Sequence, residues 1–367
     1  MAATTARPLS PRASRSGAKP RGSAPPDDSK FFHQTLRDYR KLTNDALLAL
    51  VPTEGPRYLY DLVPSYPLRQ GKGLRGALCL ATCAALGGSI HQALNTAVAL
   101  ELFHNAFLIH DDVQDASENR RGAPTLHREH GIPIALNVGH ATNLLALQRL
   151  MENRTLLGPR VSWQIMQETE RMMAHSLAGQ AMELSWIRDN VCDLGEKDYL
   201  QMCLKKTSWY SFIYPMRLGA LIAGRTSLDT DAFCRLGWYF GAAFQIQDDV
   251  LNLAGEFGKY GKEIGGDLLE GKRTLMLIHV LKHCAPDESR RLKSFLAKPR
   301  AARSEGEAAW LLARMFHYES IDHARRSARQ LAGAALLEAL STFRAEPDSS
   351  DKQFILEMVL YVVNRDR

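Results

Sequence analysis

Several features that would mark other classes of protein are missing from this sequence. No stretch reaches about 18 apolar residues without a charge, so no membrane span is expected. Runs of β-branched residues are short, and no Asn-Gly or Asp-Gly dipeptide marks a hairpin, so strands are not expected. No basic stripe is interleaved with aromatic residues, which argues against nucleic acid as a partner.

Cysteine pairs at metal-binding or redox spacing are also missing. The six cysteines are scattered, mostly in apolar helical context, and no CxxC pair occurs. Scattered cysteines of this kind are typical of free, buried thiols in a reducing compartment. We therefore expect a cytoplasmic protein without disulfides.

The chain is long enough for a large core. It has 367 residues, 45% of them apolar, which suffices for one large helical domain or two smaller ones. The net charge is +6, and the first 21 residues carry five Arg or Lys and no acid. Residues 1–29 are rich in Ala, Pro, Arg and Ser, and we expect a disordered tail there, with a transit peptide as the alternative. Residues 30–367 are expected to form one domain.

An acidic cluster ends the apolar stretch at residues 98–126. Asp111 and Asp115 lie one helical turn apart on one face, with Asp112 between them. Three carboxylates this close repel one another and need cations. Oxygen ligands suit Mg2+, which usually bridges one or two carboxylates to substrate phosphates. The alternative for such a cluster alone is a solvated helix end.

A second apolar helix, in residues 240–256, ends in the same way. It carries Asp248, Asp249 and, one turn later, Asn252. Two such helices could face each other across one cavity. Basic residues occur at several other points of the chain, and acid and base that converge on one cavity are what a Mg2+–diphosphate site requires. These basic residues are Lys72, Arg75, Arg120, Arg121, Lys205, Lys206, Lys259, Lys262, Lys272 and Arg273.

This combination resembles the trans-isoprenyl diphosphate synthases of the polyprenyl synthetase family. DDVQD followed by RRG is similar to the first aspartate-rich motif of the family, and FQIQDDVLN is similar to the second. The other diphosphate-binding segments are matched by GKGLR (71–75), KKT (205–207) and GKEIGGDLLEGKRT (261–274). The resemblance covers roughly residues 45–345, with five motifs in order.

The resemblance implies a role for each matching residue. It assigns the diphosphate of isopentenyl diphosphate to Lys72, Arg75, His104 and Arg121. The allylic diphosphate and the reacting groups are assigned to Arg120, Gln180, Lys206, Thr207, Gln245, Lys262 and Lys272. Three positions depart from the family pattern. Gly76 stands where Pro is common, and His140 and Asn252 stand where Asp is usual.

The resemblance also implies Mg2+, as three ions when substrate is bound, with Asp111, Asp115 and Asp248 as metal ligands and Asp112 as a further catalytic residue. The reaction would join isopentenyl diphosphate head-to-tail to an allylic diphosphate. Metal and basic side chains would neutralise the departing diphosphate, and apolar helices would keep water from the allylic cation. The expected partners are these two substrates and a second copy of the chain.

Product length would depend on the depth of the apolar pocket below Asp111. Ala106, where a bulky aromatic residue tends to stop growth at C15 in the family, is small. Phe107 and Phe103 flank it, and Phe103 lies about one turn, roughly 5 Å, deeper. We therefore expect a floor near C20 and geranylgeranyl diphosphate as product. Farnesyl diphosphate and a longer polyprenyl product are the alternatives.

Two other classes compete with a synthase. A terpene cyclase would ionise a prenyl diphosphate without adding an isopentenyl unit, and a regulatory subunit would have no catalysis of its own. The isopentenyl-side residues argue against the first class, and the two intact Asp pairs argue against the second.

Apolar periodicity predicts an all-α fold, a single large helical bundle around a central apolar cavity. The expected helices cover residues 30–52, 90–115, 131–158, 160–185, 198–224, 230–254, 275–284, 287–297, 304–317, 320–342 and 350–364.

Overall fold

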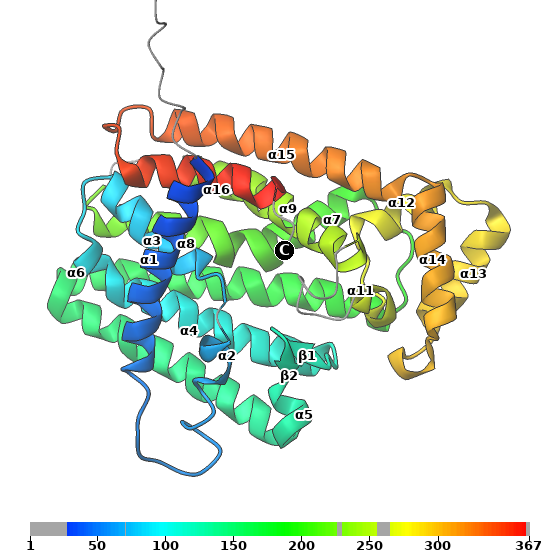
Figure 1. Cartoon of the computed structure of the whole chain (residues 1–367), viewed down its shortest axis with the longest axis horizontal. Helices are drawn as coiled ribbons and strands as arrows, with labels where there is room; N and C mark the ends of the chain where they lie inside the picture. The colour runs from blue at the N-terminus through cyan, green and yellow to red at the C-terminus, as the bar shows by residue number, and fades with distance from the viewer. Residues whose placement is uncertain (1–27, 70, 226–229, 255–264, 365–367) are drawn as a thin grey trace, which may run out of the picture.

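The structure is a computed structural model, and it describes residues 28–69, 71–225, 230–254 and 265–364. Nearly all of this part of the chain is helical, so the predicted all-α fold is confirmed (Figure 1). Residues 1–27 of the predicted tail lie outside the described residues, and its last two residues, 28–29, belong to the first helix. The first helix begins at Asp28 and ends at Leu48, a few residues before Pro52.

The helices of the first half of the chain build the centre of the bundle. They are α1 (Asp28–Leu48), α2 (Ser65–Leu68), α3 (Leu74–Ala85), α4 (Ile90–Gln114), α5 (Leu126–His130), α6 (Ile132–Arg188), α7 (Glu196–Cys203), η1 (Leu204–Ile213), α8 (Tyr214–Ile222) and α9 (Thr230–Ala254). The second half adds α11 (Gly266–Glu270), α12 (Leu275–His283), α13 (Pro286–Ala297), η2 (Arg300–Ala302), α14 (Glu305–His317), α15 (Ser320–Thr342) and α16 (Ser350–Asn364).

Two apolar clusters hold these layers together. One joins α1, α3, α4, α8 and α16, and the other joins α7, α12, α13, α14 and α15. Figure 1 shows α15 along one edge of the molecule, the long α6 along the opposite side, and α13 and α14 at one end. The helices α4, η1 and α9 lie between these outer layers and, together with α6, surround the site described below.

Two local features differ from the sequence-based expectation, and a third agrees with it. Strands were not expected, yet β1 (Asn119–Arg120) and β2 (Ala123–Pro124) form a small antiparallel ribbon. The two strands are joined by a turn at Arg121 and Gly122, both of which have positive φ. Asn-Gly and Asp-Gly are the usual sequence signals of such a turn, and Arg-Gly is not one of them. The break expected between the helices over 131–158 and 160–185 is confirmed, because α6 consists of two helices joined across Gly158, whose φ of 81° and ψ of 165° are not helical.

The second difference concerns the expected helix over 198–224. It is divided into α7, the π-helix η1 and α8. Two glycines on neighbouring helices allow a close approach to η1. A Cβ at Gly179 of α6 would lie 2.2 Å from the backbone nitrogen of Lys206, and a Cβ at Gly241 of α9 would lie 2.2 Å from Ser208 Oγ. The π-helix η1 therefore packs directly against the backbone of α6 at one glycine and of α9 at the other. Such π turns are frequent at functional sites.

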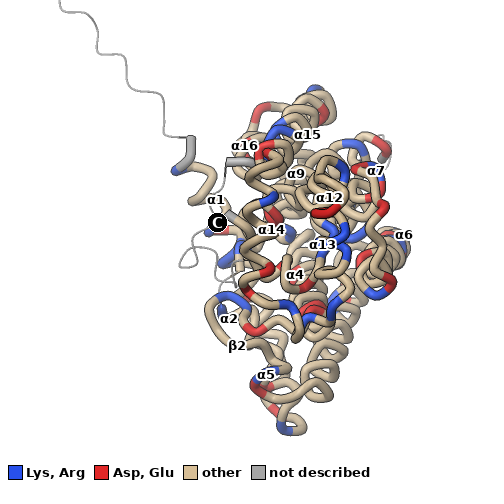
Figure 2. Tube along the Cα trace, turned by 90° about the vertical axis from the view of Figure 1, so that its right-hand side faces the viewer, with Lys and Arg blue, Asp and Glu red and all other residues tan. Residues whose placement is uncertain are grey.

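The surface and the cysteines agree with a conventional helical protein. All six cysteines are unpaired, as expected. Within the described ranges, no helix is both long and apolar enough to cross a membrane. Lys, Arg, Asp and Glu are interspersed along the chain (Figure 2). Because these charges are interspersed, the charged side chains expected to act in function are those inside the bundle.

Candidate active site

A cavity of about 960 Å³ opens among α1, α3, α4, α6, η1 and α9. Asp111 at the end of α4 and Asp248 near the end of α9 both line it. The two acidic helix ends therefore face one cavity, as the sequence predicted. The volume is at the upper end of the range for small-ligand pockets.

Asp112, the second residue of the first cluster, points away from this cavity. It is fully buried, and Arg120 Nε donates hydrogen bonds of 2.9 and 3.2 Å to its two carboxylate oxygens. Tyr66 Oη donates a third, of 2.6 Å. Burial lowers and the paired carboxylates raise the pKa of Arg120, with a net rise. Asp112 thus holds Arg120 at the cavity wall, where Arg120 Nη2 lies 4.0 Å from Asp111 Oδ2.

Asp115, the third residue of the cluster, is held by a lysine that comes from far along the chain. Lys272 Nζ lies 2.7 Å from Asp115 Oδ2 and 2.7 Å from Glu270 Oε2. Asp115 is buried, which raises its pKa to about 7, while Lys272 acts to lower it. Lys272 lines the cavity, so a cation predicted to bind diphosphate lies beside a carboxylate predicted to bind metal.

The second acidic cluster has a different second aspartate. Asp249 is buried, and Tyr199 Oη and Gln245 Nε2 each donate to it over 2.7 Å. No described cation forms an ion pair with Asp249, and burial raises its pKa to about 8. Gln245 Oε1 accepts a 2.7 Å bond from Thr207 Oγ1, so one chain of hydrogen bonds joins η1 to α9.

Asn252 also has a structural role at this end. Its Oδ1 accepts a 3.1 Å hydrogen bond from the backbone N–H of Asp267, at the start of α11. Asn252 is buried and is not among the described residues that line the cavity. The amide at this departure from the family pattern therefore fixes the loop that carries Lys272.

Lys206 of η1 joins α6 to the acidic end of α4. Its Nζ contacts Glu183 of α6 and lies 3.6 Å from Asp111 Oδ1. These carboxylates raise the pKa of Lys206, although burial acts to lower it. Gln180 Nε2 donates to Asp111 Oδ1 over 3.2 Å. Lys206 and Gln180, both predicted from sequence, therefore converge on Asp111.

The opposite wall is basic. Lys72, Arg75, His104 and Arg121 all line it. Burial lowers the pKa of Arg121 to about 10. Burial and the nearby arginines hold the pKa of His104 well below its usual range, so this imidazole is neutral. Arg75 donates 2.7 Å bonds to Tyr210 Oη and Ser211 Oγ. The four predicted isopentenyl-side residues are therefore brought together.

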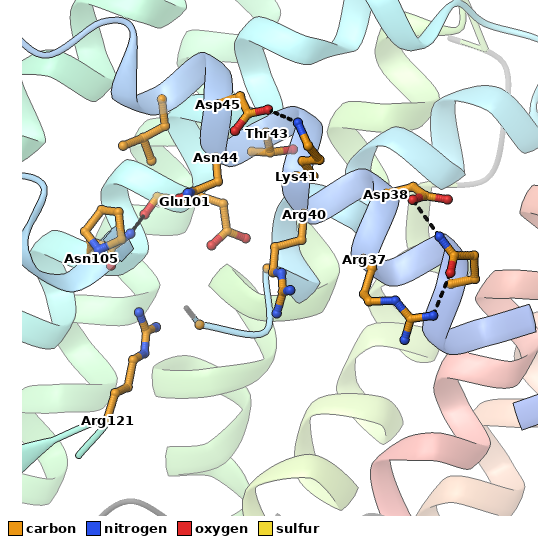
Figure 3. Close-up of a pocket in the computed structure, with 15 residues that line it drawn as sticks. Arg37, Asp38, Arg40, Lys41, Thr43, Asn44, Asp45, Glu101, Asn105 and Arg121 are labelled. Carbon is orange, nitrogen blue, oxygen red and sulfur yellow. Dashed lines mark hydrogen bonds and ion pairs between the residues drawn. The ribbon is translucent and has the colours of Figure 1, made fainter. Parts of the chain in front are cut away.

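A second, polar pocket of about 400 Å³ lies behind this wall, against α1. Figure 3 shows Arg40, Arg121 and Glu101 turned toward the same space. Glu101 Oε1 accepts a 2.9 Å hydrogen bond from the backbone N–H of Gly76. A proline at position 76 has no N–H to donate. The Gly76 departure therefore places a carboxylate next to the basic wall, an effect beyond a change at the helix start.

Apolar side chains line the rest of the cavity. They are Leu36, Leu74, Phe107, Leu108, Met173, Leu177 and Phe244. Phe103 and Ala106 are buried, and neither is among the described residues that line the cavity. Their assignment to chain length stays a prediction.

Some lining residues were missed from sequence. His33, Arg37 and Arg40 of α1 line the cavity, and their spacing of four and three residues puts them on one helix face. That spacing was the available signal. His140, at a position where the family usually has Asp, lines the cavity, and its ring centroid lies 5.1 Å from that of His110. Lys262 and Lys259 lie outside the described residues.

The donor set fits magnesium that is completed by substrate. Among the described residues, no three His, Cys, Asp or Glu side chains form a metal site by themselves. Mg2+ is commonly bound by one or two carboxylates together with substrate phosphates, and closed protein cages are unusual for it. Carboxylates on two facing helix ends, with cations around them, match that mode.

Comparison with known proteins agrees with this geometry. Residues 56–314 match the family model described as polyprenyl synthetase. The chain belongs to the polyprenyl synthetase family. It is therefore a prenyltransferase, as the motifs indicated.

Relatives cover most of the chain. A geranylgeranyl pyrophosphate synthase of Geoglobus acetivorans is 31% identical over 92% of this chain and 100% of its own length. An octaprenyl diphosphate synthase of Haemophilus influenzae is 28% identical over 81% of this chain and 85% of its own. Among solved structures, geranylgeranyl pyrophosphate synthetase from Pyrococcus horikoshii Ot3 aligns with a TM-score of 0.80 and 28% identity over 92% of this chain and 99% of its own. These names span different product lengths, so the family alone does not fix the product.

Proposed function

We propose that this protein joins isopentenyl diphosphate head-to-tail to an allylic diphosphate and makes geranylgeranyl diphosphate. One observation carries the proposal. Asp111 and Asp248 face a single cavity whose far wall is formed by Lys72, Arg75 and Arg121. An acidic side and a basic side in one pocket suit two diphosphates, one bound through metal and one bound directly.

The chain's own residues divide the work. Asp111, Asp115 and Asp248 would hold Mg2+, which neutralises the diphosphate as it leaves. Arg120, Lys206 and Lys272 add positive charge on the same side, and such contacts strengthen as the C–O bond breaks. Lys72, Arg75, Arg121 and neutral His104 hold isopentenyl diphosphate. Phe107, Phe244 and their apolar neighbours exclude water from the allylic cation.

The product assignment rests on the pocket and on relatives. Ala106 leaves the position above Phe103 small, and several relatives carry geranylgeranyl names. Phe107 lines the cavity and Phe103 lies about one turn, roughly 5 Å, further along α4. We therefore keep Phe103 as the floor of the pocket, reached by a growing C20 chain.

We further propose a cytoplasmic homodimer. Leu144, Leu147 and Met151 are exposed on α6 at helical spacing, and Leu177 is exposed on its second half. A second copy of the chain would cover this stripe. Six free cysteines suit a reducing compartment. Size-exclusion chromatography with light scattering should give twice the monomer mass, and Met151→Glu should shift it to the monomer mass.

The first test is an incubation of purified protein with Mg2+, isopentenyl diphosphate and each of dimethylallyl, geranyl and farnesyl diphosphate. The products are treated with phosphatase, and the alcohols are sized. A C20 alcohol is expected. A C15 or much longer alcohol would keep the reaction and remove the product assignment. A cyclic hydrocarbon without isopentenyl incorporation would move the protein to the terpene cyclases.

The floor is tested with three variants of α4. Phe103→Ala should lengthen the product, and Ala106→Phe should shorten it. Phe107→Ala is the matched comparison, because Phe107 is the aromatic side chain at the cavity wall. Lengthening by Phe107→Ala with no change in Phe103→Ala would move the floor one turn closer to Asp111.

A further inference from the structure

A closed ring of polar contacts joins the end of α4 to two segments far along the chain. Lys272 Nζ contacts the side chain of Asp115 at 2.7 Å and that of Glu270 at 2.7 Å. Arg300 Nη1 lies 3.0 Å from Glu270 Oε1 and donates a 3.1 Å hydrogen bond to the backbone carbonyl of Asp115. The ring starts and ends on Asp115, so both its backbone and its carboxylate are fixed.

The position and the burial of the ring members favour these contacts. Asp115 is the C-cap of α4, where helix carbonyls lack partners and a cation is favourable. The side chains of Asp115, Glu270 and Lys272 are 4%, 10% and 14% exposed, so water screens these charges little. Arg300 is 25% exposed, and it is the one member that comes from outside the acidic motif and the loop of Lys272.

The origin of Arg300 makes it informative. It stands in η2, the short turn between α13 and α14, 185 residues after Asp115. Its neighbour Arg303 donates to the carbonyls of Leu269 and Leu296, so it ties the same loop to α13 without touching α4. Arg300 alone of the two therefore connects the loop to the acidic helix end.

We infer that Arg300 is a positioning residue for the allylic diphosphate, acting through Glu270 and Asp115. It holds Lys272, which lines the cavity, at a fixed place beside the buried Asp115 carboxylate, so the Lys272 ammonium meets the allylic diphosphate in one position. The inference rests on the proposed function, because it assigns this side of the cavity to the allylic substrate. Arg300 touches no reacting atom and lies outside the cavity lining among the described residues.

The test compares Arg300→Gln with Arg300→Lys and with Lys298→Gln. Lys298 lies two residues away and pairs with Glu307, near the end of α13, without contact to Asp115 or the loop of Lys272. Steady-state kinetics are measured separately for the allylic substrate and for isopentenyl diphosphate. Isothermal titration with inorganic diphosphate and Mg2+ gives a readout that needs no turnover, and thermal unfolding reports stability.

Arg300→Gln should lower kcat/KM for the allylic substrate about tenfold, since small misplacement of charged groups has effects of this order. It should weaken diphosphate binding by about the same factor and leave KM for isopentenyl diphosphate within about twofold. Arg300→Lys keeps the charge and should recover part of the loss. Lys298→Gln should match the wild type in kinetics and diphosphate binding.

The outcomes distinguish failure of this inference from failure of the proposed function. If the wild type transfers prenyl groups and Arg300→Gln behaves like Lys298→Gln, the positioning role is overturned. The same holds if Arg300→Gln lowers only the unfolding temperature, or affects both substrates equally. If the wild type itself adds no isopentenyl unit, the proposed function fails first, and the diphosphate titration still reports on the ring.

Discussion

The ends of α4 and α9 present Asp111 and Asp248 to the same cavity, and each buries its next aspartate against a tyrosine. Tyr66 donates to Asp112 at 2.6 Å, and Tyr199 donates to Asp249 at 2.7 Å. Beyond the tyrosine the two ends differ. Asp112 has a buried arginine as its partner, whereas the other partner of Asp249 is the neutral amide of Gln245.

The difference shows how one motif can be held in two electrostatic ways. At α4, Asp112 forms a buried ion pair with Arg120 and so directs a cation to the cavity wall. At α9, burial without a cation raises the pKa of Asp249 to about 8, so the carboxyl retains its proton near neutral pH. The first end carries paired charge and the second carries a neutral hydrogen-bonded group.

The largest expected contrast is in stability. Asp112→Asn would leave Arg120 buried without its counter-ion, and breaking a buried pair from one side costs about 3–5 kcal/mol. Asp249→Asn removes no ion pair and should cost at most about 1–2 kcal/mol, for one weakened hydrogen bond, because the asparagine also needs no proton uptake on folding at pH 7. Urea unfolding at pH 7 without Mg2+ measures both. Equal losses would show that Asp249 is also held as a charge.

Catalysis should treat the two ends alike. Asp111→Asn and Asp248→Asn each remove a carboxylate that lines the cavity. Asp111 also lies 3.6 Å from Lys206 Nζ and 4.0 Å from Arg120 Nη2, so the unfolding control matters most for Asp111→Asn. Each variant should lower kcat by about 10²–10³-fold, as for loss of one group that stabilises transition-state charge. Steady-state rates at saturating Mg2+ report this, with unfolding as the control for the fold. A large loss in only one variant would assign the metal mainly to that helix.

The pH dependence of stability should also separate the ends. The folded-state pKa of Asp249 is raised from 3.8 to about 8, so between these values the folded protein binds an extra proton. The stability from this group is complete below about pH 4 and is lost as the pH rises through about 8. Asp249→Asn should therefore flatten the curve of unfolding free energy against pH, measured in urea without Mg2+. An unchanged slope would place that proton elsewhere.

The smallest effect is expected at Asn252. Asn252→Asp keeps an oxygen that can accept the hydrogen bond from the Asp267 backbone, and at about pH 4 a buried carboxyl stays protonated, so stability there should change by less than about 1 kcal/mol. Because this side chain does not line the cavity, the rate should stay within about threefold. Kinetics across a Mg2+ series test this. A large gain in Mg2+ affinity would mean that position 252 reaches the metal.

Local patterns allowed much of the fold to be predicted. Apolar residues at helical spacing predicted the bounds of α4, α9, α12 and α15 to within a residue or two. A helix that packs against a core repeats its buried apolar residues at the helical period, so the sequence shows where it begins and ends. Helix ends with a π turn, and a ribbon of two residues per strand, leave no such periodic signal.

Site prediction divided along the same line. The motifs identified which residues carry charge, and spacing within a helix put Asp111 and Asp115 on one face. Only the tertiary structure decided that Asp112 turns to Arg120, that Asp249 is neutral, and that Arg300 reaches Asp115. The sequence alone determined the helical bundle and its two acidic helix ends. Their partners come from 4 to 185 residues away, and burial, which sets their charge, exists only once the helices have packed.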